Sequence, residues 1–186
     1  MAAKSSSGVT LVLGPARSGK SRWAEHLAAS SGLPVHYLAT GPQPSAADPA
    51  WAERVGAHRL RRPSGWTSQE VGCQLTEALN CLSPPGLVLV DSLGTWVAAG
   101  LDLDPSDWHQ RCQALCHSLS HCSLPVVLVS EQCGWGVVPA TAIGGRFRDR
   151  LGDLEQQLQP ICSNLWLVIA GRALDLRASS QPVPGD

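Results

Sequence analysis

The sequence predicts an α/β domain with a mainly parallel sheet flanked by helices. Short apolar, β-branched runs alternate with longer helical stretches along most of the chain. One such run leads directly into a glycine-rich turn that opens a helix. Four of the runs end at residues suited to ligand contacts, namely Gly14, Thr40, Asp91 and Ser130. Ligands of open parallel sheets bind beyond the carboxyl ends of the strands, so we expect these four residues to share one edge.

The individual elements follow from apolar periodicity and from helix-breaking residues. We expect strands at residues 9–13, 35–39, 87–90, 126–129 and 165–169, the last being the final strand. We expect helices at residues 22–30, 52–62, 71–82, 106–120 and 146–159. Pro63 and the Pro84-Pro85-Gly86 run end the second and third helices. Polar or glycine-rich stretches at 43–50 and 134–145 are expected to be loops.

Length and composition favour one domain over residues 1–186, with flexible ends at 1–8 and 178–186. A net charge of −1 gives the chain no general attraction for nucleic acid or an anionic membrane. No apolar run is long enough to span a bilayer, and residues 1–10 lack the apolar core of a signal peptide. With an odd number of cysteines, seven, these features predict reduced thiols in a cytoplasmic protein.

The segment Gly14-x-x-x-x-Gly19-Lys20-Ser21 fits the Walker A, or P-loop, pattern. Its glycines allow successive N–H groups to face a phosphate, and the following helix adds its positive dipole end. Lys20 is suited to the outer phosphates and the Ser21 hydroxyl to Mg²⁺. A glycine-rich turn without a ligand is the alternative. The strand before it, the helix after it and the lysine-serine pair in register favour a triphosphate site.

A second motif, Leu87-Val-Leu-Val-Asp91, supplies a Walker B carboxylate that would hold Mg²⁺ directly or through water. Apolar runs that end in aspartate are common, so a plain strand-end residue is the alternative. The presence of a Walker A segment in the same chain favours the Mg²⁺ ligand.

The segment from Arg54 to Pro63 places one histidine among arginines. Their spacing of i, i+4, i+7 and i+8 puts four side chains on one face of a helix: Arg54, His58, Arg61 and Arg62. A neutral imidazole is a credible nucleophile toward an α-phosphorus, and the arginines could stabilise the leaving pyrophosphate. A solvated basic surface remains the alternative reading of the same pattern.

Histidines and cysteines further along also share helical spacing, in the sets His109, Cys112 and Cys116, and His117 and His121. Zinc normally needs four convergent ligands, and the chain has no paired Cys-x-x-Cys knuckle. We therefore expect no metal site in this helix.

Several motifs together resemble a known family. They are Gly14-Pro-Ala-Arg-Ser-Gly-Lys-Ser-Arg22, Tyr37-Leu-Ala-Thr40, Arg54-Val-x-x-His58, Arg62-Pro63-x-x-Trp66 with Glu70, Gly134-Trp-Gly-Val-Val-Pro139, Phe147-Arg-Asp149 and Trp166-Leu-Val-Ile-Ala-Gly171. From Thr10 to about Arg177 the chain resembles the bifunctional adenosylcobinamide kinase/adenosylcobinamide-phosphate guanylyltransferases of cobalamin biosynthesis.

The resemblance implies a RecA-like P-loop NTPase fold and a two-step transferase. Such an enzyme phosphorylates adenosylcobinamide with ATP or GTP. It then takes GMP from GTP onto a histidine, here His58, and passes it on to give adenosylcobinamide-GDP. The resemblance also implies Mg²⁺ and a homo-oligomer, typically a trimer.

The residues that the resemblance assigns fall into three groups. The catalytic residues would be His58 and Lys20, and the Mg²⁺ ligands Ser21 and Asp91. The nucleotide contacts would be Gly14, Pro15, Ala16, Arg17, Ser18, Gly19, Lys20, Ser21, Thr40, Gly41, Pro42, Arg59, Leu60, Arg61, Arg62, Glu70 and Asp91.

The chain departs from the family pattern at a few positions. Ala57 stands where many relatives have a second histidine, which leaves His58 the only candidate in the segment. Relatives tend to have Asn-Glu-Val-Gly where this chain has Glu131-Gln-Cys-Gly134, so the usual carboxylate is shifted or replaced by Gln132. Glu155 stands where an asparagine is usual. We expect these last segments near the phosphoryl acceptor.

Two other functions fit the same sequence. One is a P-loop kinase of a different small alcohol, with His58 as a phosphate contact. The other is a nucleotide-binding regulator with reduced catalysis, in which Gln132 and Glu155 reflect the loss.

Overall fold

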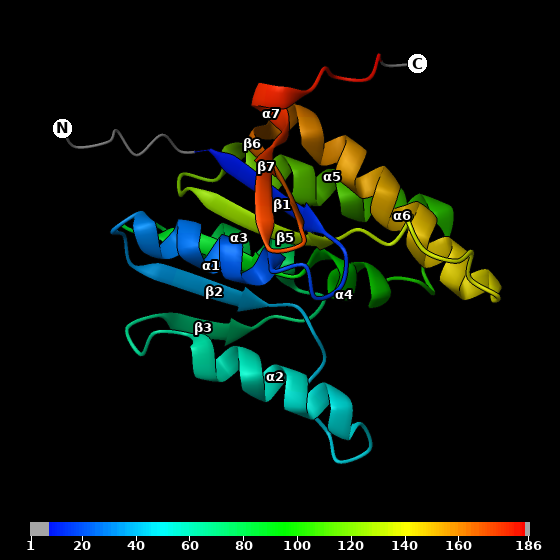
Figure 1. Ribbon diagram of the computed structural model, residues 1–186, viewed down its shortest axis with the longest axis horizontal. Helices are drawn as coiled ribbons and strands as arrows, with labels where there is room; N and C mark the ends of the chain where they lie inside the picture. Colours follow the sequence, from blue (N-terminus) through cyan, green and yellow to red (C-terminus); the bar gives the residue numbers. More distant parts are fainter. Residues whose placement is uncertain (1–7, 185–186) are drawn as a thin grey trace.

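A seven-stranded sheet organises residues 8–184, the part of the chain that the computed structural model describes (Figure 1). The strands are β1 (Val9–Gly14), β2 (Val35–Ala39), β3 (Thr67–Glu70), β4 (Leu87–Asp91), β5 (Val126–Glu131), β6 (Cys162–Ile169) and β7 (Arg172–Asp175). Their order is β3-β2-β4-β5-β1-β6-β7. All neighbouring strands are parallel except β6 and β7. The expected fold class, a mainly parallel sheet flanked by helices, is therefore confirmed.

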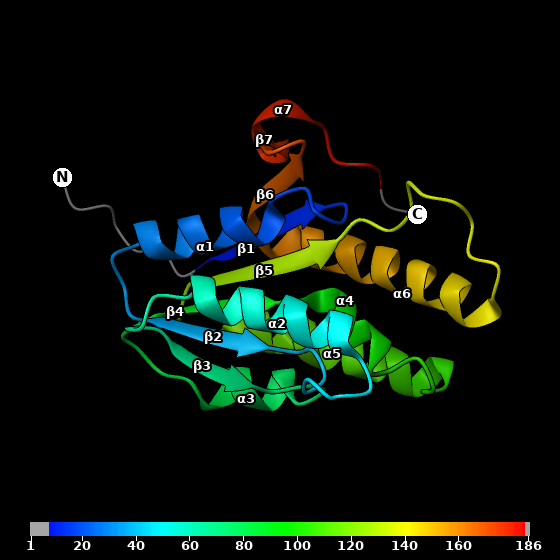
Figure 2. The same ribbon diagram turned by 60° about the horizontal axis from the view of Figure 1, so that its bottom comes forward.

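Helices cover both faces of this sheet. They are α1 (Lys20–Ser30), α2 (Pro49–Arg61), α3 (Leu75–Cys81), α4 (Leu93–Ala98), α5 (Pro105–His121), α6 (Ala142–Leu158) and α7 (Leu176–Ser179), with a 3₁₀ turn at Gln159–Ile161. Helix α1 packs on one face, and α3 to α6 cover the other. Helix α2 lies on the α1 side, beside β2 and β3 (Figure 2). No helix among residues 8–184 is both long and apolar enough to cross a membrane.

The two faces of the sheet carry separate cores because side chains alternate along each strand. On β4, Val88 and Val90 join the core beneath α3 to α6, whereas Leu89 joins the core beneath α1. All three are fully buried. Burial on both faces explains why the strands appear in the sequence as continuous apolar runs.

Strand β3 was not expected, and the helix after it is shorter than predicted. All four residues of Thr67–Glu70 are exposed and none is strongly apolar, so the sequence carries no strand signal there. The strand forms by pairing with the edge of β2. The pairing continues into the next segment, where the N–H of Val71 donates to the carbonyl of Ala39 at 2.8 Å. Helix α3 therefore begins at Leu75 rather than at residue 71.

The prediction that residues 165–169 form the final strand is wrong, because β7 follows. Ala170 and Gly171 both have positive φ, of 50° and 73°. Two such residues form the tight turn that suits an antiparallel hairpin. The N–H of Gly171 also donates to the carbonyl of Ser18 at 3.1 Å, so the hairpin supports the P-loop from behind.

Two helices begin inside expected loops, and two further helices, α4 and α7, were not predicted. Asp48 caps α2 through the N–H of Trp51 and is followed by proline at the first helical position, so α2 begins within the expected loop at 43–50. Thr141 caps α6 in the same way, through the N–H of Gly144. Helix α4 directly follows β4. Helix α7 includes residues 178 and 179, so the expected flexible end at 178–186 is wrong at its start. Residues 1–7 and 185–186, which the expected flexible ends include, lie outside the described residues.

Candidate functional site

The P-loop joins β1 to α1 and has the backbone that a phosphate cradle needs. Arg17 and Gly19 have φ of 59° and 102°, which fold the loop back on itself. A Cβ on Gly14 would lie 2.4 Å from the carbonyl oxygen of Val168, so only glycine fits there. Lys20 begins α1 and is 4% exposed. The loop thus directs backbone N–H groups and the Lys20 ammonium toward the space in front of the N-terminus of α1.

A cleft of about 610 Å³ lies over this loop, and we name it the P-loop cleft. Its floor is formed by residues 16–22 and its other wall by one face of α2, which includes Arg54, His58 and Arg61. Beneath it the Ser18 hydroxyl is buried with no hydrogen-bond partner among the described residues. A buried donor left unsatisfied is costly, and an anion in the cleft would satisfy it.

A second cleft, of about 330 Å³, opens at the carboxyl ends of β2, β4 and β5, and we name it the strand-end cleft. Its walls include Tyr37, Asp91, Glu131 and Phe147. Arg54 and His58 of α2 line both clefts. The edge of the sheet that the sequence predicted to gather the ligand contacts is therefore where both clefts meet.

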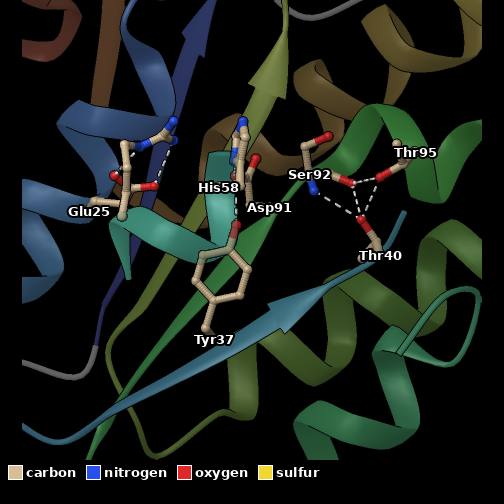
Figure 3. Close-up of polar contacts among 8 residues, drawn as sticks. Glu25, Tyr37, Thr40, His58, Asp91, Ser92 and Thr95 are labelled. Carbon is tan, nitrogen blue, oxygen red and sulfur yellow. Dashed lines mark hydrogen bonds and ion pairs between the residues drawn. The ribbon is translucent and has the colours of Figure 1, made fainter. Parts of the chain in front are cut away.

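The His58 ring is held by a buried carboxylate. Its Nδ1 lies 3.2 Å from Oδ2 of Asp91, and the Tyr37 hydroxyl donates to the same oxygen at 2.8 Å (Figure 3). Beside an ionised carboxylate, the proton of a neutral imidazole resides on Nδ1, so Nε2 keeps its lone pair. The face predicted to carry His58 toward the triphosphate does face the P-loop.

Hydrogen bonds and a nearby positive charge favour the ionised form of Asp91. Burial alone would raise the pKa of this carboxyl, but the hydrogen bonds from His58 and Tyr37 and the charge of Lys20 bring the pKa below its ordinary value. Burial, together with the charge of Asp91, raises the pKa of Tyr37. Asp91 is therefore a carboxylate acceptor and Tyr37 a neutral donor at neutral pH.

The arginines at the end of α2, and Arg62 just after it, have different partners. Arg61 lines the P-loop cleft and pairs with Glu25 of α1 at 3.0 Å. Arg62 lines the strand-end cleft, with its guanidinium 3.6 Å from the centroid of the Tyr37 ring. Arg59 points elsewhere, to an ion pair with Glu70. Positive charge therefore borders both clefts around His58.

The structure brings most of the sequence-predicted site residues together. The P-loop cleft collects Ala16, Arg17, Ser18, Gly19, Lys20, Ser21 and Arg61. The strand-end cleft collects Gly41, Pro42, Arg62, Glu70 and Asp91. Gly14, Pro15, Arg59 and Leu60 line neither cleft, and Leu60 is 89% exposed. On a helix, positions 59 and 60 face away from the surface that carries 54, 58, 61 and 62.

Thr40 is near these clefts, but its hydroxyl binds residues at the edge of the sheet instead of lining a cleft. It is 2% exposed, and its hydroxyl accepts from the N–H of Ser92 at 2.9 Å and bonds to the Thr95 hydroxyl at 2.7 Å (Figure 3). These bonds tie the end of β2 to the start of α4. Thr40 therefore positions Gly41 and Asp91 from behind.

The residues predicted to hold Mg²⁺ fit a hard cation beside a triphosphate. Ser21 lines the P-loop cleft, and Asp91 is an ionised carboxylate. His58 and Tyr37 both use Oδ2 of Asp91, and neither engages Oδ1. Oxygen ligands of this kind, completed by phosphate and water, suit Mg²⁺. Among residues 8–184, no three His, Cys, Asp or Glu side chains form a metal-binding group by themselves.

One residue of the strand-end cleft, Glu131, is not among the site residues predicted from the sequence. The expected strand ended at Val129, but β5 continues by two residues and pairs Glu131 with Gly14 of the P-loop. Its neighbour Gln132 folds back to accept from the N–H of Gly134 at 2.6 Å and lines neither cleft. Extending the apolar run by its period of two would have marked Glu131 as a strand-end residue.

Comparison with known proteins places these features in a family. Residues 10–176 match the model of the family described as "Cobinamide kinase / cobinamide phosphate guanyltransferase". The chain is 37% identical over 169 residues to the bifunctional adenosylcobalamin biosynthesis protein CobP of Pseudomonas aeruginosa, with 90% of this chain and 96% of that protein covered. It is 34% identical over 182 residues to CobU of Escherichia coli, which has the same description, with 90% and 98% covered.

Comparison with solved structures supports the fold and nothing beyond it. One, from Pyrococcus horikoshii, has a TM-score of 0.57 at 7% sequence identity, and the match covers 91% of this chain and 86% of that chain. Another, an ATPase of a bacterial type III secretion system, has a TM-score of 0.54 at 9% sequence identity, and the match covers 95% of this chain and 59% of that chain. The P-loop NTPase fold expected from the sequence is confirmed, and the chain belongs to the cobinamide kinase / cobinamide phosphate guanyltransferase family.

Proposed function

We propose that this chain phosphorylates adenosylcobinamide with ATP or GTP and then transfers GMP from GTP, through His58, to give adenosylcobinamide-GDP. Family membership supports both halves of the activity. The observation that carries the role of the histidine is its position: His58 lines both clefts, with the P-loop on one side and the strand ends on the other. A group received from a nucleotide in one cleft could be passed to an acceptor in the other.

The P-loop cleft would bind the triphosphate. Its N–H groups, the Ser18 hydroxyl and the Lys20 ammonium are the donors, and the α1 dipole adds to them. Mg²⁺, held by Ser21 and Asp91, would neutralise charge that develops on the phosphate oxygens. The nucleotide contacts predicted from the sequence belong to this proposal.

Guanylyl transfer would use Nε2 of His58. In the first step a bond forms from Nε2 to the α-phosphorus, the bond from that phosphorus to the bridging oxygen breaks, and pyrophosphate leaves with the electron pair. The hydrogen bond from Nδ1 to Asp91 supports the positive charge that the ring gains. In the second step a phosphate oxygen of adenosylcobinamide phosphate displaces Nε2.

Two arginines of α2, together with Arg62 just after it, would stabilise charge that appears during these steps. Arg61 and Arg54 line the P-loop cleft, where pyrophosphate would leave. Arg62 lines the strand-end cleft, where the phosphorylated acceptor would arrive. An arginine fork suits phosphate better than a lysine point charge does.

Labelling with GTP tests the role of His58. Incubation with α-³²P-labelled GTP and Mg²⁺ should give a protein-bound label that is stable to alkali, labile to acid and located at His58 by mass spectrometry. The His58→Ala variant should lose the label and still phosphorylate the alcohol. His26→Ala, on α1, is a matched control that should keep the label. A His58→Ala enzyme that still forms adenosylcobinamide-GDP would rule out the histidine relay.

Assembly as a homotrimer belongs to the same proposal. Light scattering of the purified chain on a sizing column should give about three times the chain mass of 19.6 kDa. A monomeric mass would refute this part and leave the transfer chemistry untouched.

A further inference from the structure

The strand-end cleft contains a carboxylate that the transfer steps above leave without a role. Glu131 ends β5, next to the P-loop strand, and lines the cleft together with Asp91 and Phe147. The positions of β4, β5 and β1 in the sheet order set Glu131 between the Walker B strand and the P-loop. Asp91 and Glu131 line the same cleft, and Glu131 is paired in register with Gly14, the first residue of the P-loop.

The carboxylate of Glu131 is held in a defined seat. The N–H of Gly94, at the start of α4, donates to Oε2 of Glu131 at 2.9 Å. A Cβ at position 94 would lie 2.2 Å from that oxygen and 2.9 Å from Cδ. Glycine at 94 is therefore the residue that leaves room for the carboxylate. Gly94 does not engage the second oxygen, Oε1.

We propose that Glu131 is the catalytic base of the phosphorylation step, which accepts the proton of the substrate hydroxyl as that oxygen attacks the γ-phosphorus. The proposal rests on the proposed function for the identity of the reaction. A phosphoryl acceptor has to reach the outer phosphate, which Lys20 binds, and Glu131 is the cleft carboxylate nearest the P-loop strand that is not committed to His58. Kinases position an acidic residue for this purpose.

The step balances without another reagent. A bond forms between the alcohol oxygen and the γ-phosphorus, and the bond from that phosphorus to the β–γ bridging oxygen breaks. The nucleoside diphosphate leaves with the electron pair. The alcohol proton goes to Oε1 of Glu131 and then to solvent. Asp91 remains ionised and continues to hold His58.

The surroundings of Glu131 favour proton acceptance. Burial and the charge of Asp91 raise its pKa, against the opposing effects of Ser92, Lys20 and the Gly94 N–H. Glu155 lies close enough for its own pKa to respond to the charge of Glu131, and it accepts a hydrogen bond from Ser130 at 2.6 Å. A carboxylate with a raised pKa is the stronger base for an alcohol proton.

The decisive experiment separates the two half-reactions in one variant. Glu131→Gln keeps the size of the side chain and a hydrogen-bond acceptor for Gly94, but it is no base. We expect kcat for phosphorylation of adenosylcobinamide by MgATP to fall by about 10²–10⁴-fold. Labelling of His58 by GTP, and transfer of GMP to adenosylcobinamide phosphate supplied as substrate, should stay near the wild-type rates. Retained labelling also shows that the variant folds.

Two further variants control for position. Gln132→Ala removes the neighbouring side chain, which lines neither cleft, and should leave phosphorylation unchanged. Gly94→Ala keeps Glu131 but displaces its carboxylate, and should slow phosphorylation without slowing His58 labelling. A Glu131→Gln enzyme with wild-type phosphorylation overturns the proposal. An equal loss in both half-reactions also overturns it, since Glu131 would then act on nucleotide binding. Failure of the wild-type enzyme to label His58 would count against the histidine relay alone.

Discussion

Helices α1 and α2 face each other across the P-loop cleft, yet they are attached to the molecule in opposite ways. Helix α1 buries Lys20, Ala24 and Ala28 against the sheet. Helix α2 is two residues longer (13 against 11) and has no buried residue. The helix that follows the P-loop is thus built into the core, and the helix that carries His58 rests on the surface.

Polar contacts rather than apolar burial hold α2 in place. They include the Arg61–Glu25 and Arg59–Glu70 ion pairs, the His58–Asp91 hydrogen bond, the hydrogen bond from the Trp51 indole to the Pro42 carbonyl, and the stacking of Arg62, which directly follows the helix, on Tyr37. The two arginine ion pairs are partly exposed, and pairs of this kind contribute about 1 kcal/mol or less each to stability. The difference teaches that the fold itself fixes the position of the P-loop, whereas the proposed nucleophile, His58, is positioned by a few contacts that single substitutions can remove.

The largest effect is expected at Asp91, the residue of β4 that binds His58 of α2. In Asp91→Asn the amide nitrogen can occupy the place of Oδ2 and donate to His58, which would put the ring proton on Nε2 and remove the nucleophilic lone pair. We expect His58 labelling by GTP to fall on the order of 10³-fold or more, as when the orienting carboxylate of a catalytic histidine is amidated. Rapid-quench labelling measures the rate, and a melting curve checks the fold.

The same interaction makes a regiochemical prediction. Because Nδ1 is committed to Asp91, the GMP of the wild-type protein should reside on Nε2. Phosphorus NMR of the digested, labelled peptide distinguishes the two isomers. An Nδ1 adduct, or an Asp91→Asn variant that labels at the wild-type rate, would show that Asp91 does not orient the ring of His58.

A smaller effect, on stability, is expected at Glu155, a largely buried carboxyl behind the edge of the sheet. Burial, reinforced by the charge of Glu131, raises the pKa of Glu155 from its ordinary 4.5 to about 7. An acid with a raised pKa binds more protons folded than unfolded between those values, so stability is greatest below pH 4.5 and falls as pH rises through 7. Glu155→Gln should remove this fall and raise the free energy of unfolding at pH 8 by about 2–3 kcal/mol.

Urea unfolding at several pH values from 5 to 8 tests that expectation. Gln157→Glu, an exposed change on the same helix, is the matched control and should leave the pH dependence as it is. A Glu155→Gln protein that loses stability with rising pH as steeply as wild type would show that this carboxyl is not the buried charge responsible.

The smallest effect on stability is expected on α2 itself. Arg61→Ala removes the ion pair to Glu25, and we expect the free energy of unfolding to change by about 1 kcal/mol or less. Amide hydrogen exchange should nevertheless rise several-fold in peptides of α2 while peptides of α1 stay protected, since α2 has few other attachments. Equal protection of the two helices in the wild-type protein would remove the contrast between them.

The sequence predicted the central strands well because they are buried on both faces. Val88, Leu89 and Val90 form an uninterrupted apolar run, and such runs are typical of parallel strands. It failed at β3, whose exposed polar residues become a strand only through pairing with β2. It failed at β7 because a two-residue turn at Ala170 and Gly171 reverses the chain with little local signal.

At the site, short local motifs were readable and distant contacts were not. The P-loop and the stripe of Arg54, His58 and Arg61 depend on spacing along one segment, which a sequence displays. The bond from His58 to Asp91 joins residues 33 positions apart, and the seat of Glu131 joins residues 37 positions apart. Spacing along the chain says nothing about such pairs.

The sequence alone therefore determined the family, the α/β class, the phosphate cradle and the identity of the candidate nucleophile, because each is encoded by residue types at fixed local spacing. Only the tertiary structure decided that His58 borders two clefts, that its Nδ1 is bound by Asp91, and that Glu131 rather than Gln132 enters the strand-end cleft. These features arise where the sheet brings the ends of β1, β4 and β5 together, and the order of strands in a sheet is set by packing.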